Sequence, residues 1–218
     1  RTGGGRASWR FQAAGAVKGG VALGDHKLVF GDYAGRLYAV RPSTGRLVWR
    51  ATTQGARFGF ASGQFYATAA LAFGRVYLGN TDGFVYSFAL DSGTLAWRHK
   101  TSGYVYASAA VGQPPKGRPS VYVGSYDGTF YALDARSGNV RWSYADGGAI
   151  SGASTLLGGI VYFSNIRKRS TLGLDARTGR VRVRIPDGAY NPVVSDTRTI
   201  YLTGKKSLYA LRPRRSAG

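Results

Sequence analysis

Few residues of this 218-residue chain could carry chemistry. It has two histidines, His26 and His99, and no Cys, and all ten acidic residues are Asp because the sequence contains no Glu. Two histidines are too few for a typical zinc site, and the lack of Cys excludes disulfides and thiolate sites. The segment Gly204–Ser207 imitates half of a phosphate-binding loop, but Thr199 stands where the first glycine of that motif belongs. The sequence therefore shows no complete catalytic constellation.

Most of the aspartates stand in predicted turns and do not form a cluster. Asp82 and Asp127 are each followed directly by Gly. Gly supplies the positive φ that a tight hairpin turn requires, and an Asp in a turn commonly binds its own backbone. We therefore interpret these carboxylates as turn-forming groups and not as metal ligands.

A repeat explains the spacing of these turns. Five glycines are each followed four residues later by Trp or, in the last copy, by Val, and successive glycines are 40, 48, 45 and 41 residues apart. The five steps are Gly5–Trp9, Gly45–Trp49, Gly93–Trp97, Gly138–Trp142 and Gly179–Val183. A period of about 40–50 residues with alternating Val, Tyr and Phe indicates one four-stranded propeller blade per repeat.

The fold class that we predict is all-β, as a single β-propeller domain over residues 1–218 with four-stranded antiparallel blades. We name the strands of a blade A to D in chain order. Strand A is rich in small residues, as in Ala67–Leu71 and Ala107–Val111, which suits the crowded innermost position. The expected blades are residues 16–53, 60–101, 104–146, 149–186, and 189–212 completed by 5–11.

The two ends of the sequence allow two versions of this propeller. Residues 5–11 have the pattern of a fourth strand, and the chain ends on a third strand at residues 207–212. Pairing of these segments would close a five-bladed ring and remove its exposed sheet edges. The alternative is that the five blades are part of a seven- or eight-bladed propeller. The sequence leaves both versions open.

The segment Tyr131–Trp142, which reads Tyr-Ala-Leu-Asp-Ala-Arg-Ser-Gly-Asn-Val-Arg-Trp, resembles the repeat of the PQQ-like, or quinoprotein alcohol dehydrogenase-like, β-propellers. Tyr38–Trp49 and Leu174–Val181 resemble it too, and the resemblance covers essentially the whole chain. It implies a structural role for the tryptophans as plugs between neighbouring blades. These residues are Trp9, Trp49, Trp97 and Trp142. Val183 replaces Trp in the fourth blade, which predicts a weaker or adapted interface there.

The family that this chain resembles has two functional branches. Some members bind pyrroloquinoline quinone with calcium and oxidise alcohols, through a Glu, an Asn and an Asp and often a vicinal disulfide. Others are non-catalytic scaffolds, among them the outer-membrane assembly lipoprotein propellers. Because the chain has no Glu and no Cys, we expect a non-catalytic binding or scaffold module without a cofactor, PQQ and calcium being possible only if further blades supply ligands. The alternative is a fragment of a PQQ-dependent dehydrogenase, or a propeller that binds a small ligand.

The formal net charge is +20, from 30 Lys and Arg residues against ten Asp. On a propeller the D–A and B–C connections share one face, so two basic B–C segments should converge there beside aromatic entrances to strand A. We expect a binding face made of Lys18, Arg57, Phe58, Tyr66, Tyr104, Tyr106, Ser151, Arg167, Lys168, Arg169, Asn191, Lys205 and Lys206. The alternative is that the aromatic residues only pack against neighbouring blades and that the charge is dispersed over edges and turns.

The expected partner is a protein or an anionic polymer, with nucleic acid as a less favoured alternative that predicts a steep salt dependence. No apolar run approaches the ~18–20 residues that span a bilayer. We expect a monomer in an extracytoplasmic location, the periplasm or the cell envelope of a bacterium.

Overall fold

The computed structural model describes residues 7–53, 63–188, 193–196 and 199–212. In these residues the chain forms nineteen strands in five antiparallel sheets, and it contains no helix and hence none that could cross a membrane. We call the sheets blades 1 to 5 in chain order. The prediction of an all-β chain built from four-stranded antiparallel modules is confirmed for blades 1 to 4, whereas blade 5 has three strands within the described part.

The strands of each blade follow one another in sequence and in hydrogen-bonded order. Blade 1 consists of β1 (Ala22–Gly24), β2 (Lys27–Gly31), β3 (Arg36–Val40) and β4 (Leu47–Thr52). Blade 2 consists of β5 (Ala70–Ala72), β6 (Arg75–Gly79), β7 (Phe84–Ala89) and β8 (Leu95–Lys100). Blade 3 consists of β9 (Ala110–Gly112), β10 (Ser120–Gly124), β11 (Thr129–Asp134) and β12 (Val140–Ala145).

Blade 4 consists of β13 (Thr155–Leu157), β14 (Ile160–Asn165), β15 (Ser170–Asp175) and β16 (Val181–Ile185), and blade 5 of β17 (Val194–Ser195), β18 (Ile200–Thr203) and β19 (Leu208–Leu211). The first strand of each blade is the innermost one, and β1, β5, β9 and β13 contact one another in that order. Small residues in and before these strands permit this close approach.

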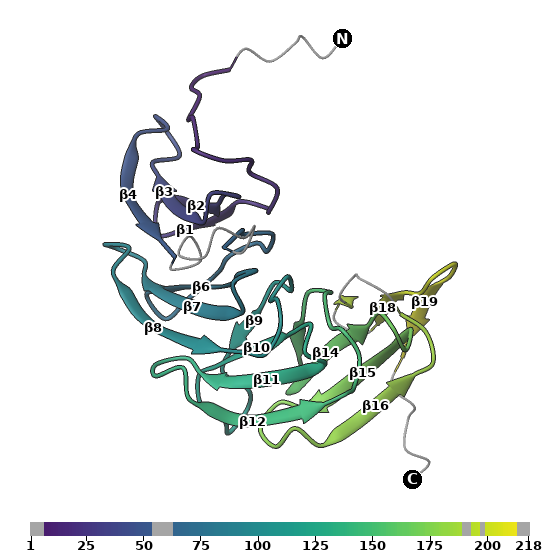
Figure 1. The fold of residues 1–218 in the computed structure, drawn as a ribbon. Coiled ribbons are helices and arrows are strands. Elements are labelled where there is room, and N and C mark those ends of the chain that lie inside the picture. The colour runs from purple at the N-terminus through teal and green to yellow at the C-terminus, as the bar shows by residue number, and fades with distance from the viewer. Residues whose placement is uncertain (1–6, 54–62, 189–192, 197–198, 213–218) are drawn as a thin grey trace, which may run out of the picture.

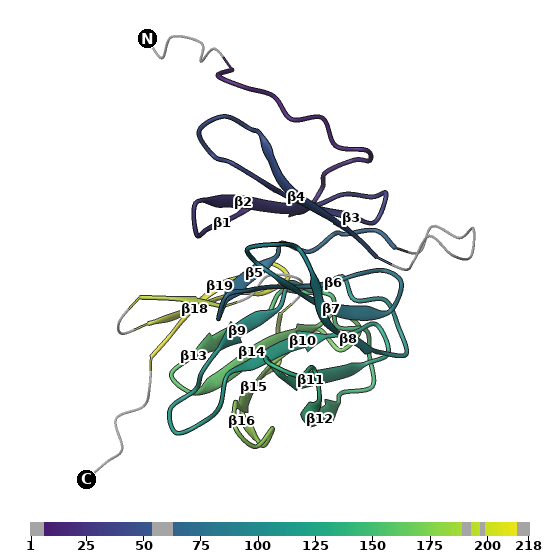
Figure 2. The same cartoon turned by 90° about the vertical axis from the view of Figure 1, so that its left-hand side faces the viewer.

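The five blades lie along an open arc (Figure 1). Blade 1 lies at one end of the arc and β18–β19 at the other, and a view from the side shows the blades stacked against one another (Figure 2). The expected strand over residues 5–11 is not formed at the described positions 7–11, and β19 does not pair with them. Instead Trp9 and Phe11 pack against Phe30 and Tyr38 of blade 1, because this contact buries their rings. The closed five-bladed version is thus not observed, and the larger propeller stays a prediction.

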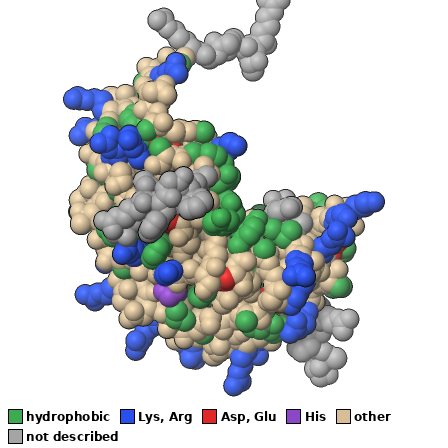
Figure 3. All heavy atoms as spheres, viewed as in Figure 1, with side chains coloured by type: hydrophobic (Ala, Val, Ile, Leu, Met, Phe, Trp, Pro, Cys, Tyr) green, Lys and Arg blue, Asp and Glu red, His purple; other side chains and the backbone are tan. Residues whose placement is uncertain are grey.

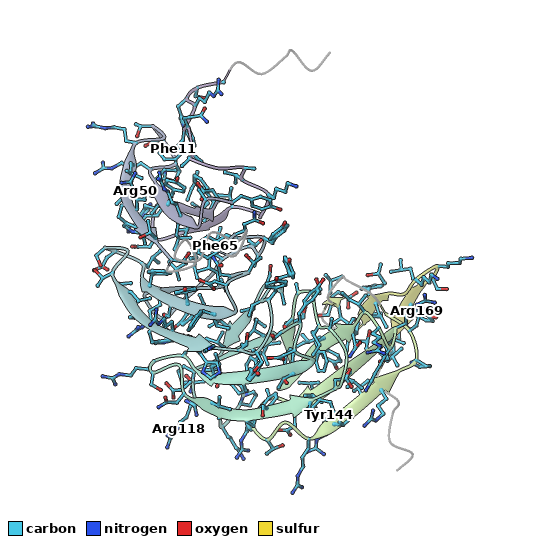
Figure 4. The ribbon with its side chains drawn as sticks, viewed as in Figure 1. Phe11, Arg50, Phe65, Arg118, Tyr144 and Arg169 are labelled. Carbon is cyan, nitrogen blue, oxygen red and sulfur yellow. The ribbon has the colours of Figure 1, made fainter. Side chains whose placement is uncertain are left out.

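The hydrophobic core lies between the blades, as repeats that cannot bury their own faces require. Leu37 and Trp49 of blade 1 pack with Phe65, Leu78 and Tyr86 around blade 2 in one such layer. Similar layers join blades 2 and 3, blades 3 and 4, and blades 4 and 5. Figure 4 shows Phe65 between the first two blades.

Each tryptophan docks onto the blade that follows it through the same kind of hydrogen bond. In each case the indole N–H donates to a backbone carbonyl near the turn between the third and fourth strands of the following blade. The N···O pairs are Trp9–Pro42 at 2.8 Å, Trp49–Leu90 at 2.9 Å, Trp97–Ala135 at 3.0 Å and Trp142–Ala176 at 3.1 Å. Val183 occupies the corresponding position of β16, opposite Gly173, and packs with Val193 and Leu202 towards blade 5.

Candidate functional site

Five tyrosines of blades 1 to 3 form one continuous group, which we call the tyrosine surface. Its members are Tyr33, Tyr66, Tyr104, Tyr106 and Tyr126. Ring centroids are 4.5 Å apart for Tyr33 and Tyr66, 4.8 Å for Tyr66 and Tyr106, and 4.8 Å for Tyr106 and Tyr126. Tyr104 lies beside the last two at 5.7 and 6.4 Å. The rings meet tilted or edge to face, a favourable arrangement for aromatic pairs.

The backbone of the repeat places these rings. Tyr33 and Tyr126 occupy the same position after the second strand of their blades, and their N–H groups donate to Ala16 O at 3.0 Å and to Tyr104 O at 2.9 Å. Tyr66 and Tyr106 follow Phe65 and Val105, whose N–H groups donate to Asp32 O and Asn80 O of the preceding blade, both at 3.1 Å. Two repeated positions therefore alternate along the arc and bring side chains from different blades together.

The outer part of the tyrosine surface is open to solvent. Tyr66, Tyr104 and Tyr126 are 38%, 51% and 40% exposed. A pocket of about 720 Å³ adjoins Tyr104 and Tyr126, and its lining includes Thr101 and Lys100. At the other end, Lys18 Nζ lies 5.0 Å from the centroid of the Tyr33 ring, within range of a cation–π interaction. The surface thus combines apolar ring area, phenol groups and two cations.

Two phenols of this surface, those of Tyr33 and Tyr106, are favoured in the neutral form. Burial raises the pKa of Tyr33, and the contact with Tyr66 raises it further. Burial also raises the pKa of Tyr106, with smaller contributions from Tyr66, Tyr126 and Tyr104. Neutral phenols both donate and accept hydrogen bonds, so the surface can pair with polar groups of a ligand as well as with apolar ones.

Apart from Lys18, the predicted basic residues of the described part lie in turns of blades 4 and 5. Arg167, Lys168 and Arg169 belong to the β14–β15 turn of blade 4, and Lys205 and Lys206 to the β18–β19 turn of blade 5. Figure 3 shows hydrophobic side chains gathered on the concave side of the arc and most Lys and Arg side chains around its outer edge. Tyr33 and Tyr126 also lie between the second and third strands of their blades, so the two basic turns lie at the same end of the blades as these tyrosines but belong to blades 4 and 5. One shared aromatic and basic binding face stays a prediction.

Lys168 has a structural partner. Its Nζ lies 3.1 Å from Asp146 Oδ1, and Asp146 is buried and also accepts a hydrogen bond from Asn165 Nδ2. A buried carboxylate needs such a partner, because desolvation of an unpaired charge is costly. Lys168 therefore compensates the charge of a buried carboxylate, whereas the side chains of Lys205 and Lys206 are exposed.

Ser151 is half-buried and follows the buried Ile150 in the segment before β13, and it belongs to no described contact with the tyrosine surface. Arg57, Phe58 and Asn191 lie outside the described residues. Tyr33 and Tyr126 were not among the site residues predicted from the sequence. Their shared position, two residues after the Gly that ends the second strand, is a signal that could have found them.

The described residues do not fit a calcium–quinone site. The carboxylates that follow the second strands of blades 1 and 3 bind groups of their own blade. Asp32 accepts hydrogen bonds from Arg36 N and Tyr38 Oη. Asp127 accepts hydrogen bonds from Thr129 N and Tyr131 Oη. No group of three or more His or Asp side chains comes together in the described part of the chain.

Comparison with known proteins identifies the family to which this fold belongs. The family model of the outer membrane protein assembly factor BamB matches residues 2–217. The chain belongs to the BamB family. No curated protein sequence matches significantly. The family match agrees with the PQQ-like repeat predicted from the sequence and with the propeller blades of the structure.

Solved structures show the same fold as this BamB-family chain. BamB from Moraxella catarrhalis is 20% identical with a TM-score of 0.75, over 94% of this chain and 64% of that one. The quinohemoprotein alcohol dehydrogenase from Comamonas testosteroni is 16% identical with a TM-score of 0.72, over 94% and 42%. The computationally designed Ika8 protein is 17% identical with a TM-score of 0.72, over 88% and 57%. This chain therefore spans less than two thirds of the length of these three structures.

Proposed function

We propose that this BamB-family chain is a non-catalytic binding module of the bacterial cell envelope, and that its tyrosine surface contacts a protein partner. One observation carries the proposal: five tyrosine rings join three blades into one surface on which Tyr66, Tyr104 and Tyr126 remain 38–51% exposed. Contiguous exposed apolar area of this kind is typical of interaction sites.

Physical chemistry favours a protein as the ligand of this surface. Tyr is enriched in protein interfaces, where it supplies a large contact area and a hydroxyl group at low cost in conformational entropy. The repeated backbone hydrogen bonds hold the tyrosines before a partner arrives, which reduces the entropy lost on binding. The net charge of +20 favours a partner with acidic groups.

The family description supports an extracytoplasmic location for this chain. Its model carries the description of an outer membrane protein assembly factor, so we place this chain outside the cytoplasm, in the periplasm or another part of the envelope. We expect the chain to act as a monomeric scaffold. No observation favours the quinone-dependent enzyme over this module.

Capture from an envelope extract tests the proposal. The test variant is Tyr66→Ala/Tyr104→Ala/Tyr126→Ala, and the matched control is Leu23→Ala/Val194→Ala/Leu208→Ala, which truncates three exposed apolar side chains outside the tyrosine surface. Quantitative mass spectrometry after cross-linking should show a protein captured by the wild type and the control but reduced at least about tenfold by the test variant.

Equal capture by the test variant and the control would contradict the assignment to the tyrosine surface. A separate titration of the wild type with pyrroloquinoline quinone and calcium distinguishes the enzyme class. A spectral change together with a higher melting temperature would favour a quinone site and count against the binding module.

A further inference from the structure

Blade 3 carries a longer connection than its neighbours. Seven residues, 113–119, join β9 to β10, whereas the corresponding turns of blades 1, 2 and 4 contain two residues each. The short turns are Asp25-His26, Phe73-Gly74 and Gly158-Gly159. Blade geometry requires only the short form, so the extra residues of blade 3 need another explanation.

The longer connection is well organised. Gly117 N donates to Pro114 O at 2.8 Å, and Gln113 Nε2 donates to Gly117 O at 3.2 Å. Ser120 Oγ donates to Arg118 O at 2.9 Å. Lys116 adopts a φ of 55°, a left-handed conformation that side chains other than Gly, Asn and Asp seldom take. Such backbone strain clusters at ligand sites, although it does not define one.

This connection forms a cationic pocket together with blade 4. The pocket has a volume of about 180 Å³ and lies between the connection, the start of β12 and the turn after β15. Its lining residues are Pro114, Lys116, Gly117, Arg118, Ser120, Arg141, Ala176 and Arg177. Four of the eight are cations, and no carboxylate lines the pocket.

Two aspartates near this pocket are already engaged. Asp134 pairs with Arg141 Nη2 and accepts hydrogen bonds from two backbone N–H groups of its own turn. Asp175 pairs with Arg182 at 3.1 Å and accepts hydrogen bonds from the N–H groups of Arg177 and Thr178. The side chains of Lys116, Arg118 and Arg177 therefore have no carboxylate partner among the described ion pairs.

Arg141 adds a second, independent observation. Its Nη2 also donates to Pro119 O at 3.3 Å, but its Nε is buried and has no hydrogen-bond partner among the described atoms. A buried N–H group of a guanidinium without an acceptor is costly and rare in proteins. An anion in the pocket would supply acceptor atoms to this arginine and to its three cationic neighbours.

We propose that this pocket binds a phosphate group. Arg donates pairs of parallel N–H groups that match the oxygen atoms of a phosphate, and Lys supplies a further point charge. Three cations without carboxylate partners suit a group with two or more negative charges better than a single carboxylate. Alternate connections of an antiparallel sheet lie at opposite ends of its strands, so this phosphate pocket lies at the end of the blades opposite the tyrosine surface.

Calorimetric titration with pyrophosphate at about 150 mM NaCl, where long-range attraction is largely screened, tests the phosphate pocket. The test variant is Lys116→Gln/Arg177→Gln. The matched control, Arg41→Gln/Arg46→Gln, removes the same charge from the turn between β3 and β4 of blade 1. We expect pyrophosphate affinity to fall at least about tenfold in the test variant and to change less than about twofold in the control. Arg177→Lys keeps the charge but loses the paired donors, and should give an intermediate loss.

The melting temperature without ligand shows that each variant is folded. No binding by the wild type, or equal losses in the test and control variants, would overturn the proposal, because binding would then be absent or would follow net charge alone. Two further arms identify the source of the phosphate group. Binding of inorganic phosphate indicates a soluble ligand, whereas retention on phosphatidylglycerol vesicles but not on phosphatidylcholine vesicles, lost in the test variant, indicates a lipid headgroup.

Discussion

The indole ring of Trp97 covers Gly138 of the next blade so closely that a Cβ atom on this glycine would lie 2.6 Å from Trp97 Cε3. Gly138 also has a φ of 76°. Within one repeat the Gly and the Trp four residues later therefore contact different neighbouring repeats. The Gly of one repeat receives the Trp of the repeat before it, and the same contact recurs at Gly45, Gly93 and Gly179.

Removal of the Trp97 indole ring should strongly destabilise the contact between blades 2 and 3. Trp97 is 8% exposed, so Trp97→Ala should lower the free energy of unfolding by about 3–5 kcal/mol through the cavity and the lost hydrogen bond to Ala135 O. Urea denaturation measures the change. Leu95→Ala on the same strand is the control, because Leu95 is 45% exposed and its loss should cost less than about 0.5 kcal/mol. Similar losses in both variants would contradict the docking role.

Because Lys168 forms an ion pair with Asp146, its replacement should cost more stability than replacement of Lys205. Lys168→Ser leaves the buried Asp146 with Asn165 as its remaining side-chain partner, so we expect a loss of stability of about 1–2 kcal/mol, less than for a fully buried pair because Lys168 is half exposed. Lys205→Ser should change stability by less than about 0.5 kcal/mol. Thermal unfolding in parallel checks both. Equal melting temperatures would show that Lys168 is only a surface charge.

Tyrosine ionisation should destabilise the propeller at alkaline pH. Burial raises the pKa of Tyr131 to about 12, helped by its hydrogen bond to Asp127, and burial raises the pKa of Tyr77 to about 12 as well. The ordinary pKa of Tyr is about 10, so the folded state favours the neutral phenol. This contribution to stability is fully present below pH ~10 and is lost as the pH rises through about 12.

Melting temperatures between pH 8 and pH 12 test this linkage. Tyr131→Phe cannot ionise and should show a smaller fall in melting temperature across this range than the wild type. Tyr104→Phe is the control, since Tyr104 lies on the exposed part of the tyrosine surface. Identical pH profiles for Tyr131→Phe and the wild type would contradict the prediction.

Asp187 holds blade 5 to blade 4. Its carboxylate accepts hydrogen bonds from Tyr209 Oη at 2.7 Å and from Lys205 N at 3.0 Å, and these donors lower its pKa. Asp187→Ala should therefore speed hydrogen exchange of the amides in β18 and β19 without a comparable effect in β6 and β7. Asp91→Ala, in a turn of blade 2, is the control. Uniform changes over all blades would contradict a local role.

Blade 5 should also loosen in acid. The pKa of Asp187 is depressed in the folded state, so its contribution is present above the ordinary pKa of about 3.9 and is lost as the pH falls below it. Hydrogen exchange of β18 and β19 at pH 3 and pH 6, corrected for intrinsic rates, measures this. The difference between the two pH values should shrink in Asp187→Ala.

The contacts within each repeat could be predicted from the sequence because they are local. Asp82-Gly83 and Asp127-Gly128 mark hairpins of two adjacent strands, and the alternation around them marks the strands themselves. Trp97 and Gly138 were identifiable as repeat positions for the same reason. Their contact needed the resemblance to a known family, since no local rule says which blade a Trp faces.

The sequence by itself determined the all-β class, the strand order within each blade and the scarcity of groups for catalysis, because hydrophobic period and turn chemistry act over a few residues. Only the tertiary structure decided that Tyr33, Tyr66 and Tyr126 share a surface, that Lys168 pairs with Asp146, and that Arg118 and Arg177 of two blades line one pocket. These groupings bring together residues from different repeats, and their members are set by the way in which whole blades stack.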